Sequence, residues 1–220
     1  MHIYYRISDN SYKKPKMCGK DKCLSNFLSK FNSCSKTFLA DNVSSEDTLS
    51  LIKDIPYQKT SLGNAGSFMA CLEDAINRFN DDKVIYFLED DYLHNGDVIE
   101  ALNEGLLFGD YVTLYDHPDK YSKLYDFGEV TKVLRKNFHW KYTISTTMTF
   151  ATKVATLKDD YSCFFKWTRN FHPEDHQIFL DINKRAKKLV SCIPGMSIHT
   201  DLTVYNNIDK SYIDNWVQHV

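Results

Sequence analysis

Apolar residues recur along this chain in two patterns that alternate from one end to the other. Leu24, Phe27, Leu28 and Phe31 follow one another at helical spacing, whereas residues 83–88 form a short, largely apolar run. Helical spacing predicts an amphipathic helix, and a short apolar run predicts a strand that is buried on both faces of a mostly parallel sheet.

The two patterns predict a regular succession of strands and helices. Strands are expected at residues 2–7, 36–40, a short stretch ending near 61, 83–88, 111–115, 142–151 and, as the last one, 189–193. Helices are expected at residues 21–32, 44–52, from the glycine-containing turn at 63–66 to 79, 98–106, from Pro173 to about 182, and near 210–217. Such alternation favours an α/β sandwich with a mostly parallel central sheet, and 220 residues suit one domain covering 1–220.

Composition narrows the possible partners. Hydrophobic residues make up 43% of the chain, so a folded globule is expected. The 27 basic and 29 acidic residues give a net charge of −2, which provides no electrostatic reason to expect nucleic acid as a partner. No apolar run approaches the roughly 20 residues of a membrane span, and the N-terminus has no signal peptide, so we expect a cytoplasmic protein with reduced cysteines.

Three acids follow directly after the apolar run at residues 83–88: Glu89, Asp90 and Asp91. Open α/β sheets bind ligands beyond the carboxyl ends of their strands. Adjacent carboxylates repel one another unless a cation joins them, and Mg²⁺ and Mn²⁺ prefer such oxygen ligands. The pattern therefore indicates a divalent cation that neutralises a diphosphate, although an acidic turn before a helix would give the same sequence.

The acids after a buried strand resemble the D-x-D motif of GT-A glycosyltransferases in a Glu-Asp-Asp variant. Residues 5–9 resemble that family's first strand where it meets the nucleotide, and residues 63–67 (Gly-Asn-Ala-Gly-Ser) resemble its turn and helix start beside the donor. Residues 173–175 (Pro-Glu-Asp) resemble the x-E-D element of inverting members. The compact size is also similar to that of the small glycosyltransferases encoded by large algal (chlorella) viruses, which would place the protein in a host cytoplasm.

The resemblance implies roles for particular residues. Asp91 and His199, together with Glu89, would hold Mn²⁺ or Mg²⁺, and Asp175 would be the general base, with Glu174 as its rival. The nucleotide-sugar donor, expected to be UDP-linked, would be bound by Arg6, Asp9, Asp41, Gly63, Asn64, Ser67, Glu89 and Asp90. Arg6 could instead form a buried ion pair, and Asp41 could belong to a simple turn. His172 and His176 are interpreted as structural.

The resemblance predicts an inverting, metal-dependent glycosyltransferase that modifies a hydroxyl of a glycan or glycoprotein. A sugar-nucleotide nucleotidyltransferase is one alternative, but residues 7–16 lack the glycine-rich loop that would hold a triphosphate. A metal-dependent phosphodiesterase or nuclease would need more scattered His and Asp ligands. A non-catalytic domain that binds a glycan or a nucleotide is the third alternative.

Overall fold

The computed structural model of the chain describes residues 1–9, 18–116 and 133–200. Its helices are α1 (Lys20–Lys30), α2 (Glu46–Ile52), α3 (Gly63–Arg78), α4 (Val98–Gly105), α5 (Val154–Trp167) and α6 (Asp175–Lys184). Its strands are β1 (His2–Ser8), β2 (Ser35–Asp41), β3 (Tyr57–Thr60), β4 (Val84–Glu89), β5 (Tyr92–His94), β6 (Tyr111–Thr113), β7 (Val133–Arg135), β8 (His139–Thr143), β9 (Phe150–Lys153), β10 (Leu189–Ile193) and β11 (Ser197–His199). The helix predicted near residues 210–217 lies outside the described residues.

The described strands build one large mixed sheet. Its order is β3-β2-β1-β4-β9-β6-β10-β8-β7. The strands from β3 to β4 are parallel to one another, and β6 and β10 form a second parallel pair. Strands β9 and β8 run opposite to the others. The predicted α/β fold with a mostly parallel central sheet is confirmed.

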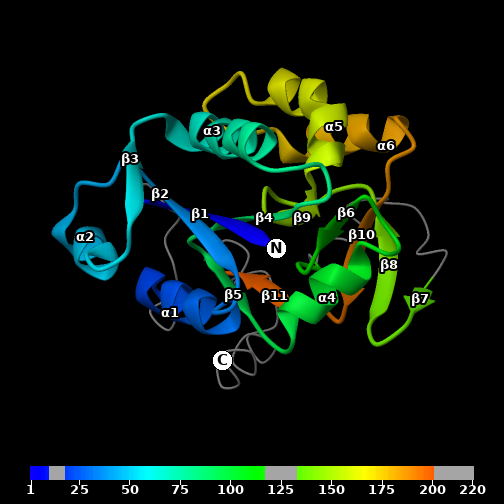
Figure 1. Cartoon of the computed structure of the whole chain (residues 1–220), viewed down its shortest axis with the longest axis horizontal. Helices are drawn as coiled ribbons and strands as arrows, with labels where there is room; N and C mark the ends of the chain where they lie inside the picture. Colours follow the sequence, from blue (N-terminus) through cyan, green and yellow to red (C-terminus); the bar gives the residue numbers. More distant parts are fainter. Residues whose placement is uncertain (10–17, 117–132, 201–220) are drawn as a thin grey trace.

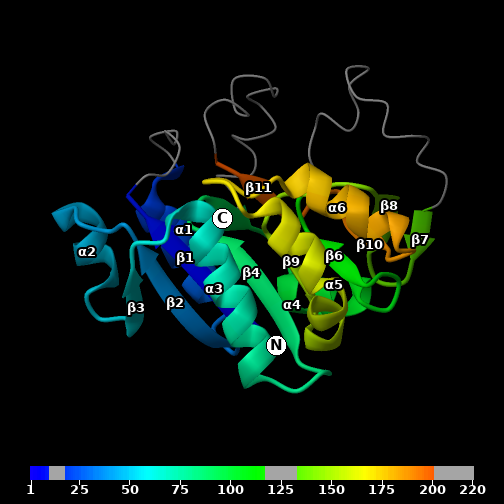
Figure 2. The ribbon, with the colours of Figure 1, turned by 90° about the horizontal axis from the view of Figure 1, so that it is seen from above.

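Helices cover both faces of this sheet, as Figures 1 and 2 show. Helices α3, α5 and α6 lie over one face, and α1 and α4 lie over the other. Successive residues of β4 point to opposite faces, so that Tyr86 and Leu88 pack with the α1 and α4 side while Ile85 and Phe87 pack with the α3, α5 and α6 side. Burial on both faces explains the apolar run in this part of the sequence.

The order of the strands reverses beside β1. From β1 the chain moves outward through α1 to β2 and through α2 to β3, and it then returns through α3 to β4 on the other side of β1. Because β1, β2 and β4 are parallel, their carboxyl ends lie at the same edge of the sheet. The reversal of strand order creates a crevice at this edge, where α/β folds bind ligands.

A small second sheet lies at this edge and joins distant parts of the sequence. Strand β5, just after the three acids, pairs antiparallel with β11, so that Tyr92 lies opposite His199. Helix α1 fastens β5, because the side-chain amide of Asn26 accepts a hydrogen bond from His94 N at 2.7 Å and donates one to His94 O at 2.9 Å. The small sheet thereby places β11, near the end of the described residues, beside the strand that follows Glu89, Asp90 and Asp91.

Several predicted elements were wrong in extent or were missed. The strand predicted at 142–151 is two strands, β8 and β9, and the residues between them belong to neither. The strand at 189–193 is not the last, because β11 follows it, and β5 and α5 were not predicted. Residues 63–66 form the first turn of α3 rather than a turn before it, and α6 begins at Asp175 rather than at Pro173.

None of the helices in the described part of the chain combines the length and apolar character that crossing a bilayer requires. Cys34 is half-buried, and the side chains of the other five cysteines are buried.

Candidate active site

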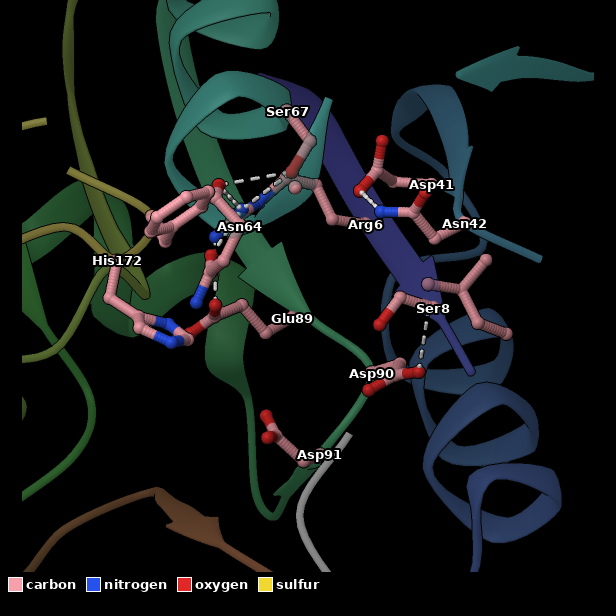
Figure 3. A pocket seen from close by; sticks show the side chains of 13 residues that line it. Arg6, Ser8, Asp41, Asn42, Asn64, Ser67, Glu89, Asp90, Asp91 and His172 are labelled. Atoms are coloured by element: carbon pink, nitrogen blue, oxygen red, sulfur yellow. Dashed lines mark hydrogen bonds and ion pairs between the residues drawn. The ribbon is translucent and has the colours of Figure 1, made fainter. Parts of the chain in front are cut away.

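A cavity of about 360 Å³ opens at the carboxyl ends of β1, β2 and β4, beside the first turn of α3. A volume of this size is typical of small-molecule sites. The lining residues are Arg6, Ile7, Ser8, Asp41, Asn42, Gly63, Asn64, Ser67, Glu89, Asp90, Asp91, Phe171 and His172. In the view of Figure 3, Asn64, Glu89 and His172 lie on one side of Arg6, and Ser8, Asp41 and Asn42 lie on the other.

Most of the residues predicted to bind donor or metal lie in this one cavity. The structure brings together Arg6, Asp41, Gly63, Asn64, Ser67, Glu89, Asp90 and Asp91. Three predicted residues are not among those that line it. His199 contacts one of the lining acids, Asp175 lies close enough to affect another, and Asp9 has a separate set of partners.

Arg6 is a buried residue that organises one wall of the cavity. Its Nη1 donates hydrogen bonds to the backbone oxygen of Asn64 at 2.9 Å, to Asn64 Oδ1 at 2.9 Å and to Ser67 Oγ at 3.1 Å. Its Nη2 donates to Glu89 Oε1 at 2.8 Å. Of the two possibilities for Arg6, the buried ion pair is therefore present. The planar guanidinium suits this task because its donors diverge in fixed directions.

Glu89 is the last residue of β4 and keeps part of its side chain accessible from the cavity. Burial raises the pKa of its carboxyl, and the negative charges of Asp91 and Asp175 act in the same direction, while Arg6 and His199 oppose the shift. Glu89 thus lies within electrostatic reach of both the metal-ligand candidates and the candidate base. One of its oxygens is occupied by Arg6, which reduces its capacity to bind a metal.

Asp90 points to the other side of the cavity, toward β1. Its Oδ2 accepts a hydrogen bond from Ser8 N at 3.2 Å and lies 3.8 Å from Lys20 Nζ. Lys20 also donates to the backbone oxygen of Ser8. Asp90 therefore joins the ends of β1 and β4 to the start of α1.

Asp91 and His199 are 108 residues apart in sequence and in direct contact in the fold. His199 Nε2 lies 3.0 Å from Asp91 Oδ2. The β5–β11 pairing sets this geometry, and His199 stacks on Tyr92 with the ring centroids 4.9 Å apart. Thr200, the residue after β11, fixes the end of this strand to Asp91, because its N and Oγ1 both donate to the backbone oxygen of Asp91, at 2.8 and 2.9 Å.

The Asp91–His199 pair fits a divalent cation in chemistry and in spacing. A carboxylate oxygen and an imidazole nitrogen are both ligands of Mn²⁺-type ions. Two neighbouring ligands of an octahedral ion, with bonds of about 2.1 Å, stand roughly 3 Å apart, and the two atoms are 3.0 Å apart. Within 1–9, 18–116 and 133–200, no three His, Cys, Asp or Glu side chains form a group that could hold a metal. Ions at nucleotide sites commonly take their remaining ligands from phosphate oxygens and water.

Asp41 and Asp9 are both engaged by the protein backbone. Asp41 is buried, and its Oδ1 accepts from Thr60 Oγ1 at 2.8 Å and from Leu62 N at 2.6 Å, which ties β2 to the start of α3. Asp9 accepts hydrogen bonds from Ser44 N at 2.7 Å and Ser45 N at 2.8 Å. Burial opposes the shift, but these hydrogen bonds from Ser44 and Ser45 hold the pKa of Asp9 well below its usual range. Asp9 therefore fixes the turn before α2.

The start of α3 requires its glycine at one position. Gly63 has φ of +75°, a conformation in which a side chain is strained, so a residue with a Cβ is disfavoured there. The turn that follows places Asn64 against Arg6 and exposes the helix N-terminus to the cavity. Backbone N–H groups at such a terminus favour anions.

Asp175 is the first residue of α6, as the predicted base in a first helical turn should be. Its Oδ1 accepts a hydrogen bond from His176 N at 2.7 Å. The rival acid, Glu174, is the residue before the helix and accepts from Asn170 Nδ2 at 3.2 Å. Of these two acids, only Asp175 is among the charges that shift the pKa of Glu89.

The sequence prediction assigned no binding role to five lining residues: Ile7, Ser8, Asn42, Phe171 and His172. Ser8 and Asn42 stand at strand ends next to predicted residues, so the strand-end rule could have found them. His172 was interpreted as structural, but it lines the cavity together with Phe171. No local pattern marks these two residues. They reach the cavity because Phe171 O accepts a hydrogen bond from Ala65 N in α3 at 3.3 Å.

Comparisons with known proteins find similarity in fold only. No known family profile matches the chain, and no curated protein matches it in sequence. The structure of a 4-diphosphocytidyl-2C-methyl-D-erythritol synthase is 8% identical, covers 99% of this chain and 98% of that one, and has a TM-score of 0.52. The galactosyltransferase LgtC, in complex with donor and acceptor sugar analogs, is 9% identical over 87% of this chain and 73% of its own, with a TM-score of 0.49.

The solved structures that resemble this chain thus include a glycosyltransferase as well as a diphosphocytidyl synthase. At 8% identity the similarity to the synthase concerns the fold alone, in agreement with the predicted fold class, and the reaction must be argued from the site. The resemblance to the small glycosyltransferases of algal viruses stays a prediction.

Proposed function

We propose that this protein is an inverting, metal-dependent glycosyltransferase that moves a sugar from a UDP-linked donor to a hydroxyl group of a glycan or glycoprotein. The observation that carries the proposal is the Asp91–His199 contact of 3.0 Å at the edge of a strongly acidic cavity.

The charge of the cavity supports a metal-bound diphosphate as its ligand. Among the described residues that line it, four are carboxylates (Asp41, Glu89, Asp90 and Asp91), while Arg6 is the one lysine or arginine. Arg6 is already paired with Glu89. A diphosphate would be repelled by this set unless a cation entered with it. Mn²⁺ or Mg²⁺ held by Asp91 and His199 would supply that charge and stabilise the departing diphosphate.

The protein's own groups provide the other requirements of glycosyl transfer. Helix α3 begins at Gly63, which lines the cavity, so the positive end of its helix dipole would favour phosphate oxygens there. Asp175 would take the proton from the attacking hydroxyl, since a carboxylate in a first helical turn is stabilised in its ionised form by the helix dipole. A base on the face opposite the leaving group leads to inversion at the sugar carbon.

A sugar-nucleotide nucleotidyltransferase is the second candidate. Lys20, which contacts Ser8 and lies 3.8 Å from Asp90, favours it, because such enzymes need a cation at the end of their first strand. Against it, the chain has no glycine before Gly19 to shape a triphosphate loop after β1.

Calorimetric titration of UDP with and without Mn²⁺ tests the proposal. Wild type should bind UDP in the presence of the metal, and Asp91→Ala and His199→Ala should weaken that binding at least tenfold. Loss of an outer-shell partner of a metal ligand already costs about 10- to 100-fold in metal affinity. Asp54→Ala, which removes an exposed carboxylate that does not line the cavity, serves as the control and should bind as wild type does.

Two results would count against the proposal. Metal-independent binding of UDP that is unchanged in Asp91→Ala would remove the role of the metal. Tighter binding of a nucleoside triphosphate than of UDP, in the same titration, would favour the nucleotidyltransferase.

A further inference from the structure

The side-chain amide of Asn64 has its orientation fixed by Arg6. Because a guanidinium only donates hydrogen bonds, the atom of Asn64 that faces Arg6 Nη1 at 2.9 Å must be its carbonyl oxygen Oδ1. The amide nitrogen Nδ2 then points away from Arg6, and it donates no hydrogen bond to any described residue, although Asn64 lines the cavity. The cavity therefore contains a donor group that is held in place by the protein and is available to a ligand.

Phe171 lines the same cavity and is 90% exposed, which makes it the most exposed large hydrophobic residue in the described part of the chain. Its backbone is nevertheless fixed at two points of the loop. Phe171 O accepts from Ala65 N at 3.3 Å, and the loop closes where Glu174 N donates to Trp167 O at 3.0 Å. When a ligand covers an aromatic ring on such an anchored backbone, apolar surface is removed from water, which favours binding.

We propose that Asn64 and Phe171 form a sugar-binding subsite for the hexose of the nucleotide-sugar donor. Asn64 Nδ2 donates to a hydroxyl group of the sugar, and the ring of Phe171 covers the apolar C–H face of the pyranose. The partly exposed carboxylate of Glu89, held by the same guanidinium, accepts from a neighbouring hydroxyl. This inference rests on the proposed glycosyltransferase function and names the residues that select its sugar.

The position of the subsite favours the sugar over the nucleobase as its occupant. Phe171 lines the cavity together with Glu89 and is four residues before Asp175, the proposed base. In the view of Figure 3, Asn64, Glu89 and His172 lie on the side of Arg6 away from Asp41 and Asn42. The sugar carbon that reacts must lie beside the base, which leaves the Asp41 and Asn42 side for the nucleoside.

The test compares, for each variant, the affinity for UDP-hexoses with the affinity for UDP alone, both with Mn²⁺. The ratio of the two affinities isolates the sugar contribution and cancels any effect on the nucleotide. Phe171→Ala should lower the ratio about fivefold, the size expected for a lost aromatic contact, while Phe171→Tyr should keep it. Phe165→Ala removes another exposed phenylalanine that does not line the cavity, and its ratio should stay at the wild-type value.

Asn64→Asp is the matched change for the amide, because it keeps the oxygen that Arg6 binds and replaces the donor by an acceptor. It should lower the ratio about fivefold, as expected for one lost hydrogen bond, and it should alter the preference between UDP-glucose and UDP-galactose. Phe171→Ala and Asn64→Asp should both unfold at the wild-type urea midpoint.

The outcomes separate the inference from the function on which it rests. If UDP binds with Mn²⁺ but both ratios stay unchanged, the subsite is wrong and the glycosyltransferase proposal stands. If Phe171→Ala weakens UDP and UDP-hexoses equally, the ring covers the base and the inference is overturned. If neither UDP nor UDP-hexoses bind with the metal, the proposed function fails and the inference fails with it.

Discussion

Among the arginine–carboxylate pairs of the described residues, Arg6–Glu89 and Arg185–Asp160 are built from similar groups but have opposite accessibility. Arg6 and Glu89 are joined at 2.8 Å, and the exposed fractions of their side chains are 6% and 23%. Arg185 and Asp160 are joined at 2.9 Å, with exposed fractions of 44% and 0%. In the first pair the arginine is enclosed and the acid faces a cavity, whereas in the second pair the acid is enclosed and the arginine faces solvent.

This difference separates a group that can meet a ligand from one that cannot. Asp160 accepts a hydrogen bond from the buried Tyr111 hydroxyl at 2.8 Å, and burial raises the pKa of its carboxyl even though Tyr111 and Arg185 oppose the shift. Its partners come from β6 and from the end of α6, so the pair fastens α5 to the elements beside it. Of these two pairs, the one with the accessible acid is therefore the candidate for function, because its carboxylate faces the cavity.

The largest expected difference between the two regions lies in catalysis. Asp175→Asn on the cavity side should lower donor turnover about 10³-fold, within the usual range for loss of a general base. Affinity for UDP with Mn²⁺ should change less than twofold, because Asp175 does not line the cavity. UDP release from UDP-sugars gives the rate, and Glu174→Gln is the matched control that should keep it. A slow Glu174→Gln beside an active Asp175→Asn would exchange the roles of the two acids.

Stability should show the reverse difference. Asp160→Ala leaves the buried hydroxyl of Tyr111 without its acceptor and should lower the free energy of unfolding by about 3 kcal/mol, near the lower end for breaking a buried pair because Arg185 can still be hydrated. Urea unfolding measures this change. UDP affinity at a temperature where the variant is folded should equal that of wild type, and a loss of affinity there would mean that the two regions are coupled.

The parallel half of the fold and the strand-end residues could be predicted from sequence for a physical reason. Strands β1 and β4 are buried over most of their length and β2 over residues 38–41, so their apolar residues are easily recognised in the sequence. Because the three strands are parallel, the polar residues that follow them meet at one edge of the sheet. Glu89, Asp90 and Asp91 entered the predicted site in this way, whereas Arg6 and Asp41 entered it through the family resemblance.

The remainder depended on contacts that no local pattern encodes. Helix α5 starts directly after β9, with no polar loop and no side-chain cap at Lys153, so the sequence contains no signal that predicts the start of this helix. Strands β5 and β11 are three residues long and pair across about a hundred residues of sequence. Phe171 reaches the cavity through a backbone hydrogen bond to Ala65, which any residue at that position could accept.

A third buried network, between His94 and Tyr86, should make the stability of the fold depend on pH. His94 lies fully buried with its Nε2 2.7 Å from the Tyr86 hydroxyl, and burial lowers its pKa from 6.5 to about 3. The unfolded chain then binds a proton more readily, so the stability that His94 contributes is complete above pH 6.5 and decreases as the pH falls toward 3.

Between pH 7 and pH 5 this residue should account for a loss of about 2 kcal/mol in the free energy of unfolding. His94→Gln, which can still bond to Tyr86 but does not titrate, should lose correspondingly less over the same interval. Urea unfolding at pH 7, 6 and 5 gives both curves. If the curves run parallel, His94 either is already protonated in the folded state or is hydrated when folded.

The smallest effect is expected when the same substitution is made in the Arg6–Glu89 and Arg185–Asp160 pairs, and it tests most directly how the two pairs differ. Arg6→Lys keeps the positive charge but cannot reproduce the fork that holds Asn64, Ser67 and Glu89 together. The side-chain amide of Asn64 should therefore lose its fixed orientation. UDP-hexose affinity should fall about tenfold, the equivalent of one or two hydrogen bonds. Arg185→Lys changes an arginine that is half exposed, so it should leave UDP-hexose affinity unchanged and lower stability by less than about 1 kcal/mol. If both variants bind UDP-hexoses equally well, the enclosed guanidinium of Arg6 only supports the fold, and the accessibility of Glu89 would no longer distinguish the two pairs.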